Sequence, residues 1–482
     1  MPSLPLVQEL VPAPTPLEAA TRLAGLPHLT LLESSAPLSS ISRYSFLSAD
    51  PVHVIRNRSG STTRAMPVRG ETIPLDTDPI RAVHNLLAPF AQDSIPGLPP
   101  FQGGALGYIG YEYGHTLERL PHARFDDIEL PDVSIGIYDW TIAWDRASGR
   151  AWIISTGLPT LGAGREQRAG ERMRLVQSAL RDATTGHRVR REPRMRARLA
   201  PTFPMRAGQP LRSTFTAERY PAAVREVVEY ILRGDVFQVN LSQRFEGPAP
   251  GDPLELYRRL RDITPSPFGA FLDFGDGFLV SASPERFLSY DPATRMVETR
   301  PIKGTRPRGG SIEEDERLRA ELASSEKDRA ENVMIVDLLR NDLSRVCASG
   351  SVQVPALLAL ESHPTVHHLV STVTGRLEAG RTMVDLVHAT FPGGSITGAP
   401  KIRAMEIIAE LEPTVRGPYT GSLGYWSLSG AMDTSIVIRS FVIVDDRAYF
   451  HAGGGIVADS DPRAEYQETL DKADALIRAL FP

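Results

Sequence analysis

Ser435-Ile-Val-Ile-Arg-Ser-Phe-Val-Ile-Val444 is followed, after Asp445-Asp446, by Ala448-Tyr-Phe-His-Ala452, and this stretch decides the fold. Both runs are rich in β-branched and aromatic residues, which favour strands, and a turn this short joins strands that run antiparallel. Residues 269–273 and 278–283 form a second such pair. We therefore expect an α+β fold with largely antiparallel sheets rather than a doubly wound one.

Helical segments are interspersed with these strands. Apolar residues recur every three or four positions between Val224 and Ile231, and Gly234 follows at the position of a helix C-cap. This pattern predicts a helix over residues 220–233, with a strand over 236–245 after it. Similar spacing predicts four further helices, at residues 312–322, 329–340, 401–411 and 462–480.

The composition divides the chain into three parts. Residues 1–182 mix strand-like runs with a helical segment, and residues 214–482 hold the elements described above. Residues 183–213 contain prolines, six arginines between Arg188 and Arg198, and few large apolar side chains. Such a basic tract could bind nucleic acid, but in a chain of net charge -5 it is typical of a solvated linker.

Overall composition excludes several classes of protein. A net charge of -5 argues against a general binder of nucleic acid or anionic membranes, and a single cysteine, Cys347, excludes an intrachain disulfide and a multi-cysteine zinc site. No apolar run reaches the roughly 18 residues that span a bilayer. The N-terminus lacks the basic region of a signal peptide. We expect a cytoplasmic protein that binds small molecules or another protein.

Lys303, in Pro301-Ile-Lys-Gly-Thr305, is a candidate nucleophile. A lysine attacks only as the neutral amine, so its pKa must be lowered by burial or by neighbouring cations. Pro301 restricts the backbone before it and Gly304 relaxes the backbone after it. Three arginines that could lower its pKa flank it in the sequence: Arg300, Arg306 and Arg308.

Two carboxylate pairs are candidate ligands for a hard cation. Asp328 with Glu331 and Glu465 with Glu468 are spaced i, i+3, so each pair lies on one face of its helix. If the pairs face each other, they could hold Mg²⁺, which prefers oxygen ligands. The alternative is that they form ordinary surface ion pairs with neighbouring cations, namely Lys327, Arg329 and Lys472.

Two backbone segments and one arginine could bind anions. Residues 391–401 lead into a helix at Lys401 whose first turn Thr397 or Ser395 could cap, and N–H groups at such an end attract anions. Gly453-Gly454-Gly455 comes directly after the strand predicted at residues 448–452 and could present converging N–H groups. Arg439 lies within an apolar run, so we expect it to meet a core aspartate or a ligand carboxylate.

Two further side chains could transfer protons. Glu285, in Ser-Pro-Glu-Arg-Phe, could be a general acid if burial raises its pKa, or could pair with Arg286. His367 and His368 are neighbours, so in a strand they point to opposite faces and at most one of them faces a site.

Taken together, these segments resemble the chorismate-binding enzymes, which include the anthranilate and aminodeoxychorismate synthases. The ordered motifs that carry the resemblance are Gly-Asp-Val-Phe-Gln-Val-Asn (234–240), Ser-Pro-Glu-Arg-Phe (283–287), Pro-Ile-Lys-Gly-Thr (301–305), Lys-Asp-Arg-Ala-Glu-Asn (327–332), His-Leu-Val-Ser (368–371), Gly-Ala-Pro-Lys (398–401) and Ala-Gly-Gly-Gly-Ile-Val (452–457). The N-terminal part matches more loosely. The resemblance implies an antiparallel β-sandwich of two sheets with helices packed outside.

The resemblance also implies roles for individual residues. Mg²⁺ would bind Glu331 and Glu468, with Asp328 and Glu465 behind them, and would hold a substrate carboxylate. Thr397 and His368 would line the substrate ring. The groups that would bind the substrate's carboxylates are the side chains of Tyr425, Arg439 and Lys401 and the backbone of Gly453, Gly454 and Gly455.

The type of reaction depends on Gln238 and Lys303. In the family that this chain resembles, members that add water carry a lysine where this chain has Gln238. A glutamine cannot act as a base to activate water. The resemblance therefore favours ammonia over water as the nucleophile. In having lysine at position 303, this chain resembles the aminodeoxychorismate synthases, whereas anthranilate synthases have alanine there. The resemblance therefore implies amination of chorismate at C4 through a covalent lysine intermediate, with Glu285 as acid. Cys347 lies outside a glutaminase motif, so a separate glutamine amidotransferase would supply ammonia.

One motif favours a different member of the family. Leu31-Leu32-Glu33-Ser34 resembles the tryptophan pocket of anthranilate synthases. The chain could thus be an anthranilate synthase with an unusual lysine, or a C4-aminating enzyme that retains the pocket, which we prefer. A noncatalytic chorismate or tryptophan sensor is a third alternative, disfavoured because Lys303, Glu285 and the four carboxylates are all present.

Overall fold

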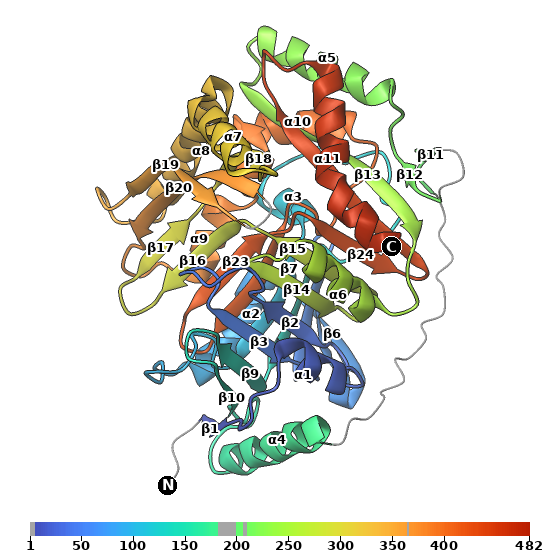
Figure 1. Ribbon diagram of the computed structural model, residues 1–482. Helices are drawn as coiled ribbons and strands as arrows, with labels where there is room; N and C mark the ends of the chain where they lie inside the picture. The colour runs from blue at the N-terminus through green and yellow to red at the C-terminus, as the bar shows by residue number, and fades with distance from the viewer. Residues whose placement is uncertain (1–4, 182–198, 206–209, 364–365) are drawn as a thin grey trace.

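The computed structural model describes residues 5–181, 199–205, 210–363 and 366–482, and these residues form two large antiparallel sheets with helices outside them (Figure 1). In spatial order, the first sheet contains β1 (Leu6–Glu9), β10 (Arg150–Ser155), β9 (Trp140–Asp145), β3 (Tyr44–Ser48), β2 (Thr30–Glu33), β14 (Phe268–Asp273), β15 (Phe278–Ser283), β24 (Ser440–Val444), β25 (Arg447–Ile456), β13 (Gln238–Pro248), β12 (Arg212–Ser213) and β11 (Phe203–Pro204), with β21 (Gly398–Ala399) also on β13.

The second sheet contains β18 (Ile302–Pro307), β20 (Val366–Arg376), β17 (Met296–Thr299), β16 (Arg286–Asp291), β23 (Met432–Ile436), β22 (Ser422–Ser427), β7 (Gly104–Ile109), β8 (Val133–Tyr138), β4 (His53–Arg58), β5 (Ser61–Met66) and β6 (Glu71–Leu75), with β19 (Gln353–Ser362) on β20. The helices are α1 (Pro16–Arg22), α2 (Pro79–Leu87), α3 (Gly114–Leu117), α4 (Gly164–Arg181), α5 (Arg219–Leu232), α6 (Pro253–Ile263), α7 (Ile312–Ser324), α8 (Glu326–Ser344), α9 (Met383–Thr390), α10 (Lys401–Leu411) and α11 (Pro462–Leu480).

Alternation along the strands builds a sandwich. On β14, Ala270 and Leu272 pack between the sheets, where they meet Leu423 of β22, whereas Phe271 points to the opposite face. On β22 itself, Trp426 packs outward. Successive strand residues face opposite sides, so an apolar run buries side chains on both faces of its sheet. The predicted α+β sandwich is confirmed.

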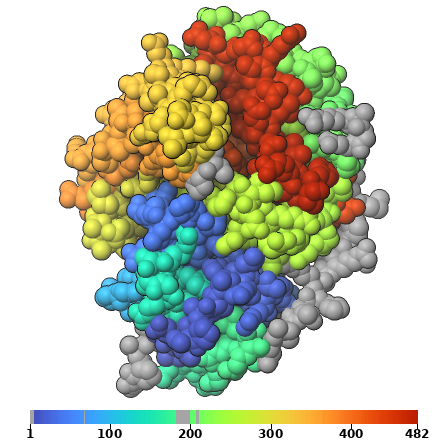
Figure 2. All heavy atoms as spheres, viewed as in Figure 1, coloured from blue at the N-terminus to red at the C-terminus, as the bar shows by residue number. Residues whose placement is uncertain are grey.

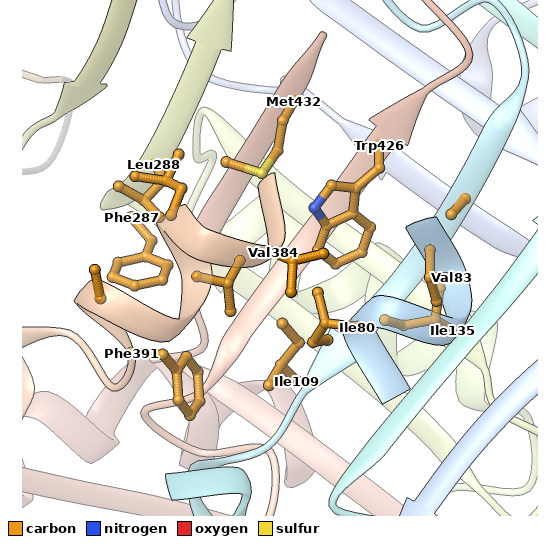
Figure 3. Packing of buried hydrophobic residues seen from close by; sticks show 14 of the residues in the cluster. Ile80, Val83, Ile109, Ile135, Phe287, Leu288, Val384, Phe391, Trp426 and Met432 are labelled. Carbon is orange, nitrogen blue, oxygen red and sulfur yellow. The ribbon is translucent and has the colours of Figure 1, made fainter. Parts of the chain in front are cut away.

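Helices cover the outer faces of both sheets. In the cluster on the second sheet, Trp426 and Met432 of the sheet pack with Ile80 of α2 and Val384 of α9 (Figure 3). The outer face of the first sheet is covered by apolar residues of α1, α4, α6 and α11. None of the described helices combines the length and apolar content needed to cross a membrane.

The N-terminal and C-terminal regions share both sheets. Gly269 of β14 pairs with Glu33 of β2 in the first sheet, and Gly424 of β22 pairs with Gly107 of β7 in the second. The two regions are therefore one intertwined fold. Of the predicted linker, β12 pairs with β13, so its end belongs to the sheet; most of the arginine-rich tract lies outside the described residues.

Several predicted elements have different boundaries in the structure. Residues 435–444 are not one strand: β23 ends at Ile436 and β24 begins at Ser440, because Arg439 takes a left-handed backbone conformation with φ of 52°. The three glycines 453–455 do not follow a strand but lie inside β25, paired with β13. By contrast, β15, α10 and α11 have the predicted boundaries.

Candidate active site

Lys303 lies at an irregularity of β18. The pairing of β18 with β20 shifts register between Ile302 and Thr305, so Lys303 and Gly304 are the residues at the shift. Gly304 has φ of 89°, and a Cβ atom there would lie 3.0 Å from the Asp328 side chain. A bulge of this kind re-aims a side chain and is common beside active sites. Glycine is required next to Lys303 both by the backbone conformation and by the close approach of α8.

The pKa of the Lys303 amine is lowered, as predicted, but the flanking arginines are not the cause. Burial lowers the pKa, and the ammonium of Lys472 adds to the effect, while Glu331 and Glu285 oppose it. The flanking arginines do not contribute, because each has its own carboxylate. Those pairs are Arg300 with Glu361, Arg306 with Glu321 and Asp328, and Arg308 with Asp315.

Glu285 is a buried acid in the turn between β15 and β16. Its Oε1 accepts a hydrogen bond of 2.6 Å from the Ser395 hydroxyl, and the Ile302 backbone, next to Lys303, lies near enough to the carboxylate to lower its pKa. Burial raises the pKa of Glu285 to about 7, although Ser395 and Lys303 act in the opposite direction. The alternative pairing with Arg286 is wrong, because Arg286 binds Asp433 and Glu298.

Three of the four predicted carboxylates, Glu331, Glu465 and Glu468, meet at Gly454 and Gly455 from α8 and α11, whereas Asp328 pairs with Arg306 at 3.2 Å. A Cβ atom on Gly454 would lie 3.1 Å from Glu468 Oε1 and 3.2 Å from Glu465 Oε2, and one on Gly455 would lie 3.4 Å from Glu331 Oε2. The glycines of β25 thus leave room for acidic side chains from both helices. Burial raises the pKa of Glu331, and the charges of Asp328 and Glu468 raise it further.

Lysines neutralise part of this acidic cluster. Lys472 lies 2.6 Å from Glu468 and Lys327 lies 3.1 Å from Glu465, so the ion-pair alternative holds for these two lysines. Lys472 lowers the pKa of Glu468. Across the described ranges, no three His, Cys, Asp or Glu side chains stand together at metal-binding spacing. The donor chemistry nevertheless suits Mg²⁺, since Glu331 and Glu468 supply hard oxygens from facing helices.

Gln238 is a fully buried amide with no partner. Neither its Oε1 nor its Nε2 has a hydrogen bond among the described residues, and it is 0% exposed. A Cβ atom on Gly455 would lie 2.2 Å from Gln238 Nε2, so the amide lies over the glycines of β25. An unsatisfied buried amide costs free energy unless a ligand or water completes it.

Arg439 supplies positive charge near the buried imidazole of His368. His368 is buried, shares a hydrogen bond of 3.0 Å with the Thr305 hydroxyl, and has its pKa lowered to about 3 by burial and by Arg439, so it is neutral at pH 7. His367 points to the opposite face and binds Asp315 and Ser362, as the alternation predicted. Arg439 has no carboxylate partner in the described part of the chain, so the core-aspartate alternative does not hold there, and binding of a ligand carboxylate stays a prediction.

Three other predicted residues have different surroundings. Thr397 does not cap α10: its hydroxyl donates to the Gly393 carbonyl, although its backbone remains next to β13 through Asn240. Lys401 donates to Asp342 at 2.6 Å, a buried structural ion pair rather than an anion site. Tyr425 lies between the sheets, because alternation along β22 turns it inward, and it contacts Phe46 with ring centroids 5.2 Å apart.

Tyr425 instead lines a cavity between the two sheets. This cavity of about 210 Å³ lies by β2, β3, β14 and β22, and includes the predicted pocket residues. Its lining includes Leu32, Glu33, Ser34, Tyr44, Phe46, Phe268, Tyr425 and Asp433. The Glu33 carboxylate already accepts hydrogen bonds from Arg261 and Tyr257, and so shapes the wall. The structure thus places Tyr425 beside Leu32, Glu33 and Ser34. It does not place Tyr425 where it was predicted to bind a substrate carboxylate.

Sequence reasoning missed Ser395 and Thr305 as site residues. Ser395 was considered only as a helix cap, yet it holds the Glu285 carboxylate, 110 residues away in the chain. No local pattern links the two. Lys472 was considered a surface cation, although its position one helical turn after Glu468 signals the contact that it makes.

The sequence matches the model of the chorismate binding enzymes over residues 29–478. The chain belongs to this family. Aminodeoxychorismate synthase component 1 of Salmonella typhimurium is 43% identical over 458 residues, covering 94% of this chain and 93% of the relative. Anthranilate synthase component 1 of Thermus thermophilus is 40% identical over 468 residues, covering 97% and 95%. The crystal structure of anthranilate synthase component I from Streptococcus pneumoniae superposes with a TM-score of 0.74 at 33% identity, covering 91% of this chain and 92% of that one.

Membership confirms the family resemblance and the fold that it implied. As a chorismate-binding enzyme, the chain has relatives of about equal identity that carry the names of two different synthases. Overall sequence identity therefore does not distinguish between the two reactions. The distinction must come from the residues around Lys303 and Glu285. Figure 2 shows the surface hollowed between the yellow spheres of α7 and α8 and the red spheres of α11; the acidic cluster lies on α8 and α11.

Proposed function

We propose that this chain aminates chorismate at C4, giving 4-amino-4-deoxychorismate for the synthesis of 4-aminobenzoate and folate. The observation that carries the proposal is that a buried amine, Lys303, lies near enough to a buried acid, Glu285, for the charge of each to act on the other, with the Glu285 carboxyl held by the Ser395 hydroxyl. An amine of lowered pKa beside a carboxyl of raised pKa is suited to nucleophilic attack and proton donation respectively.

The proposed reaction consists of two displacements. The neutral Lys303 amine attacks ring C2, the double bond shifts, and the C4 hydroxyl leaves as water with the proton of Glu285. Ammonia then adds at C4, the double bond shifts back, and Lys303 leaves. Chorismate and ammonia thus give 4-amino-4-deoxychorismate and water. Arg439 and the open edge of β25 would hold the substrate carboxylates, and the unpaired Gln238 amide supports an ordered polar ligand beside them.

We propose Mg²⁺ as the cofactor and a separate glutaminase as the source of ammonia. Glu331 and Glu468 would hold the ion, with Asp328 and Glu465 behind them; when bound, it would supply positive charge for a substrate carboxylate. Burial raises the pKa of Glu331, Lys303 and Lys327 oppose this, and Asp328 and Glu468 raise the pKa again; a cation between the carboxylates would relieve their repulsion. The designation "component 1" of the Salmonella relative implies a partner component.

The reaction is tested by incubating the protein with chorismate, Mg²⁺ and an ammonium salt and separating the products. We expect a product that yields 4-aminobenzoate only after a 4-amino-4-deoxychorismate lyase is added. Anthranilate formed without the lyase would show that the chain is an anthranilate synthase. Absence of turnover under all conditions would favour the chorismate or tryptophan sensor.

We further propose that the cavity near Tyr425 binds tryptophan. Its aromatic lining and its volume of about 210 Å³ suit an indole side chain, and Ser34 and Asp433 offer polar groups for the amino acid backbone. Isothermal titration with tryptophan is expected to show one site in the wild type, and Ser34→Trp, which fills the cavity, is expected to lose it. Equal binding by that variant would place tryptophan elsewhere. Phenylalanine serves as the ligand control.

A further inference from the structure

The four acidic side chains of the candidate site differ in how firmly the protein holds them. The Glu465 side chain is 4% exposed, and its Oε1 accepts hydrogen bonds from Ser460 at 2.6 Å and from Lys327 at 3.1 Å. Asp328 pairs with Arg306 at 3.2 Å. Either carboxylate would lose these contacts if it turned toward a bound ion.

The other two carboxylates are held more loosely. Glu331 has charged neighbours but no ion pair within the described ranges. Glu468 pairs with the ammonium of Lys472 at 2.6 Å, and the side chains of this pair are 45% and 40% exposed respectively. An ion pair with this much solvent contact contributes little to stability. A competing cation can therefore separate Lys472 from Glu468 with little loss of stability.

Lys472 has a second contact that does not depend on Glu468. The two residues are spaced i, i+4 on α11, so both side chains lie on one face of the helix. The Lys472 ammonium also donates to the Gly453 carbonyl of β25 at 3.0 Å. This contact can keep the ammonium in place when Glu468 turns to another cation. Lys472 can thus exchange partners without leaving the site.

A lysine and a divalent cation compete for the same carboxylate. Mg²⁺ binds carboxylate oxygens directly, at about 2.1 Å, and requires a near-octahedral set of ligands. If Lys472 remains on one oxygen of Glu468, its positive charge repels an ion on the other oxygen. The pair also draws the Glu468 carboxylate along its own helix, which is one reason why no three ligating side chains of the described residues stand at metal-binding spacing.

We propose that Lys472 is a displaceable counter-ion, which neutralises Glu468 until Mg²⁺ binds and so sets how tightly the site holds that ion. The inference rests on the proposed function, in which Glu331 and Glu468 bind Mg²⁺. Lys472 relieves the repulsion between these two carboxylates and at the same time lowers their affinity for the ion. It is a positioning residue, because it acts through Glu468. The site therefore binds Mg²⁺ reversibly rather than as a permanent structural ion.

The test is isothermal titration of the full chain with Mg²⁺ alone, comparing wild type with Lys472→Met. Methionine keeps much of the side-chain length and removes the charge. We expect the Kd for Mg²⁺ to fall by about 10-fold or more, because a positive charge a few ångströms from a divalent ion is removed. The matched control is Arg478→Met, which breaks an i, i+4 pair with Asp474 on the same helix. It lies about 15 Å along the helix from Glu468 and should leave the Kd unchanged.

Lys472→Arg and thermal unfolding separate the charge from the shape of the side chain. A guanidinium keeps the charge and can bind a carboxylate through two N–H groups, so this variant should bind Mg²⁺ no more tightly than wild type. In EDTA, Lys472→Met should unfold at a lower temperature than wild type, because Glu468 has lost its cation. Added Mg²⁺ should raise the Tm of Lys472→Met by more than it raises that of wild type, since tighter binding to the folded state stabilises it more.

Three results would overturn the role of Lys472. They are an equal Kd in wild type and Lys472→Met, tighter binding by Lys472→Arg as well, and the absence of Mg²⁺ binding by both wild type and Lys472→Met. In the last case, turnover of chorismate in EDTA decides whether C4 amination needs the ion. If wild type turns over no chorismate with Mg²⁺ and ammonium, the proposed reaction fails, while the Kd values, measured without chorismate, still decide the role of Lys472.

Discussion

Replacing Lys303 with alanine is expected to lower the rate of 4-amino-4-deoxychorismate formation by at least about 10³-fold, because removal of a covalent nucleophile leaves only binding and electrostatic catalysis. The amine is the one group at the shift in β18 that can form a bond to the ring, and burial keeps its pKa below that of a free lysine. The measurement is product formation from chorismate, Mg²⁺ and ammonium, with products separated. A variant that aminates chorismate at C2 instead of C4 would also agree with the prediction, because C2 amination does not require the lysine intermediate.

Two controls separate nucleophilic attack from positive charge. Lys303→Arg keeps the cation beside Glu331 and Glu285 but cannot attack, since its guanidinium stays protonated. It should be as inactive as the alanine variant. Mass spectrometry of acid-quenched wild-type protein should show an adduct on the peptide that contains Lys303. The same product at an unchanged rate in the alanine variant would remove lysine from the mechanism.

Replacing Glu285 with glutamine is expected to lower the same rate by about 10² to 10⁴-fold, the range for loss of a general acid. Glutamine fits the space and can keep the Ser395 contact, but it has no proton to give to the leaving hydroxyl. Binding should change little, so the loss should fall on kcat rather than on KM. A variant with wild-type kcat would show that another group protonates the hydroxyl.

The pH profile tests the same residue in the wild type. Burial raises the pKa of Glu285 to about 7, so the carboxyl is protonated below that pH and loses its proton above it. The rate should therefore fall as pH rises through about 7. Ser395→Ala removes a hydrogen bond that stabilises the charged carboxylate, so it should move the alkaline limb to higher pH.

Individual elements illustrate what local pattern can predict. The boundaries of β15, α10 and α11 agree with expectation because apolar period and terminal prolines are local properties of the chain. The break at Arg439 was not expected, since a left-handed residue inside an apolar run is imposed by the packing around it. The same holds for the glycines of β25, whose neighbours α8 and α11 are far away in the sequence.

The assignments of single residues divide in the same way. Alternation predicted that at most one of His367 and His368 faces a site, and the family resemblance chose His368; in the structure His367 binds Asp315, while His368 lies beside Thr305. Tyr425 carries a suitable hydroxyl, and its assignment to the substrate was wrong because the side of β22 on which it lies faces the cavity between the sheets. A period of two gives the two faces of a strand but does not say what lies against each.

The amino-acid sequence by itself determined the antiparallel sandwich, the ordered motifs of the family, and the residue types that can hold a cation or attack the ring. Only the tertiary structure decided which of these meet. Burial lowers the pKa of Lys303, whereas its arginine neighbours in the chain bind other carboxylates. Ser395 reaches Glu285 across 110 residues. The physical reason is that desolvation and charge act through space, and spatial neighbours are set by packing of distant segments.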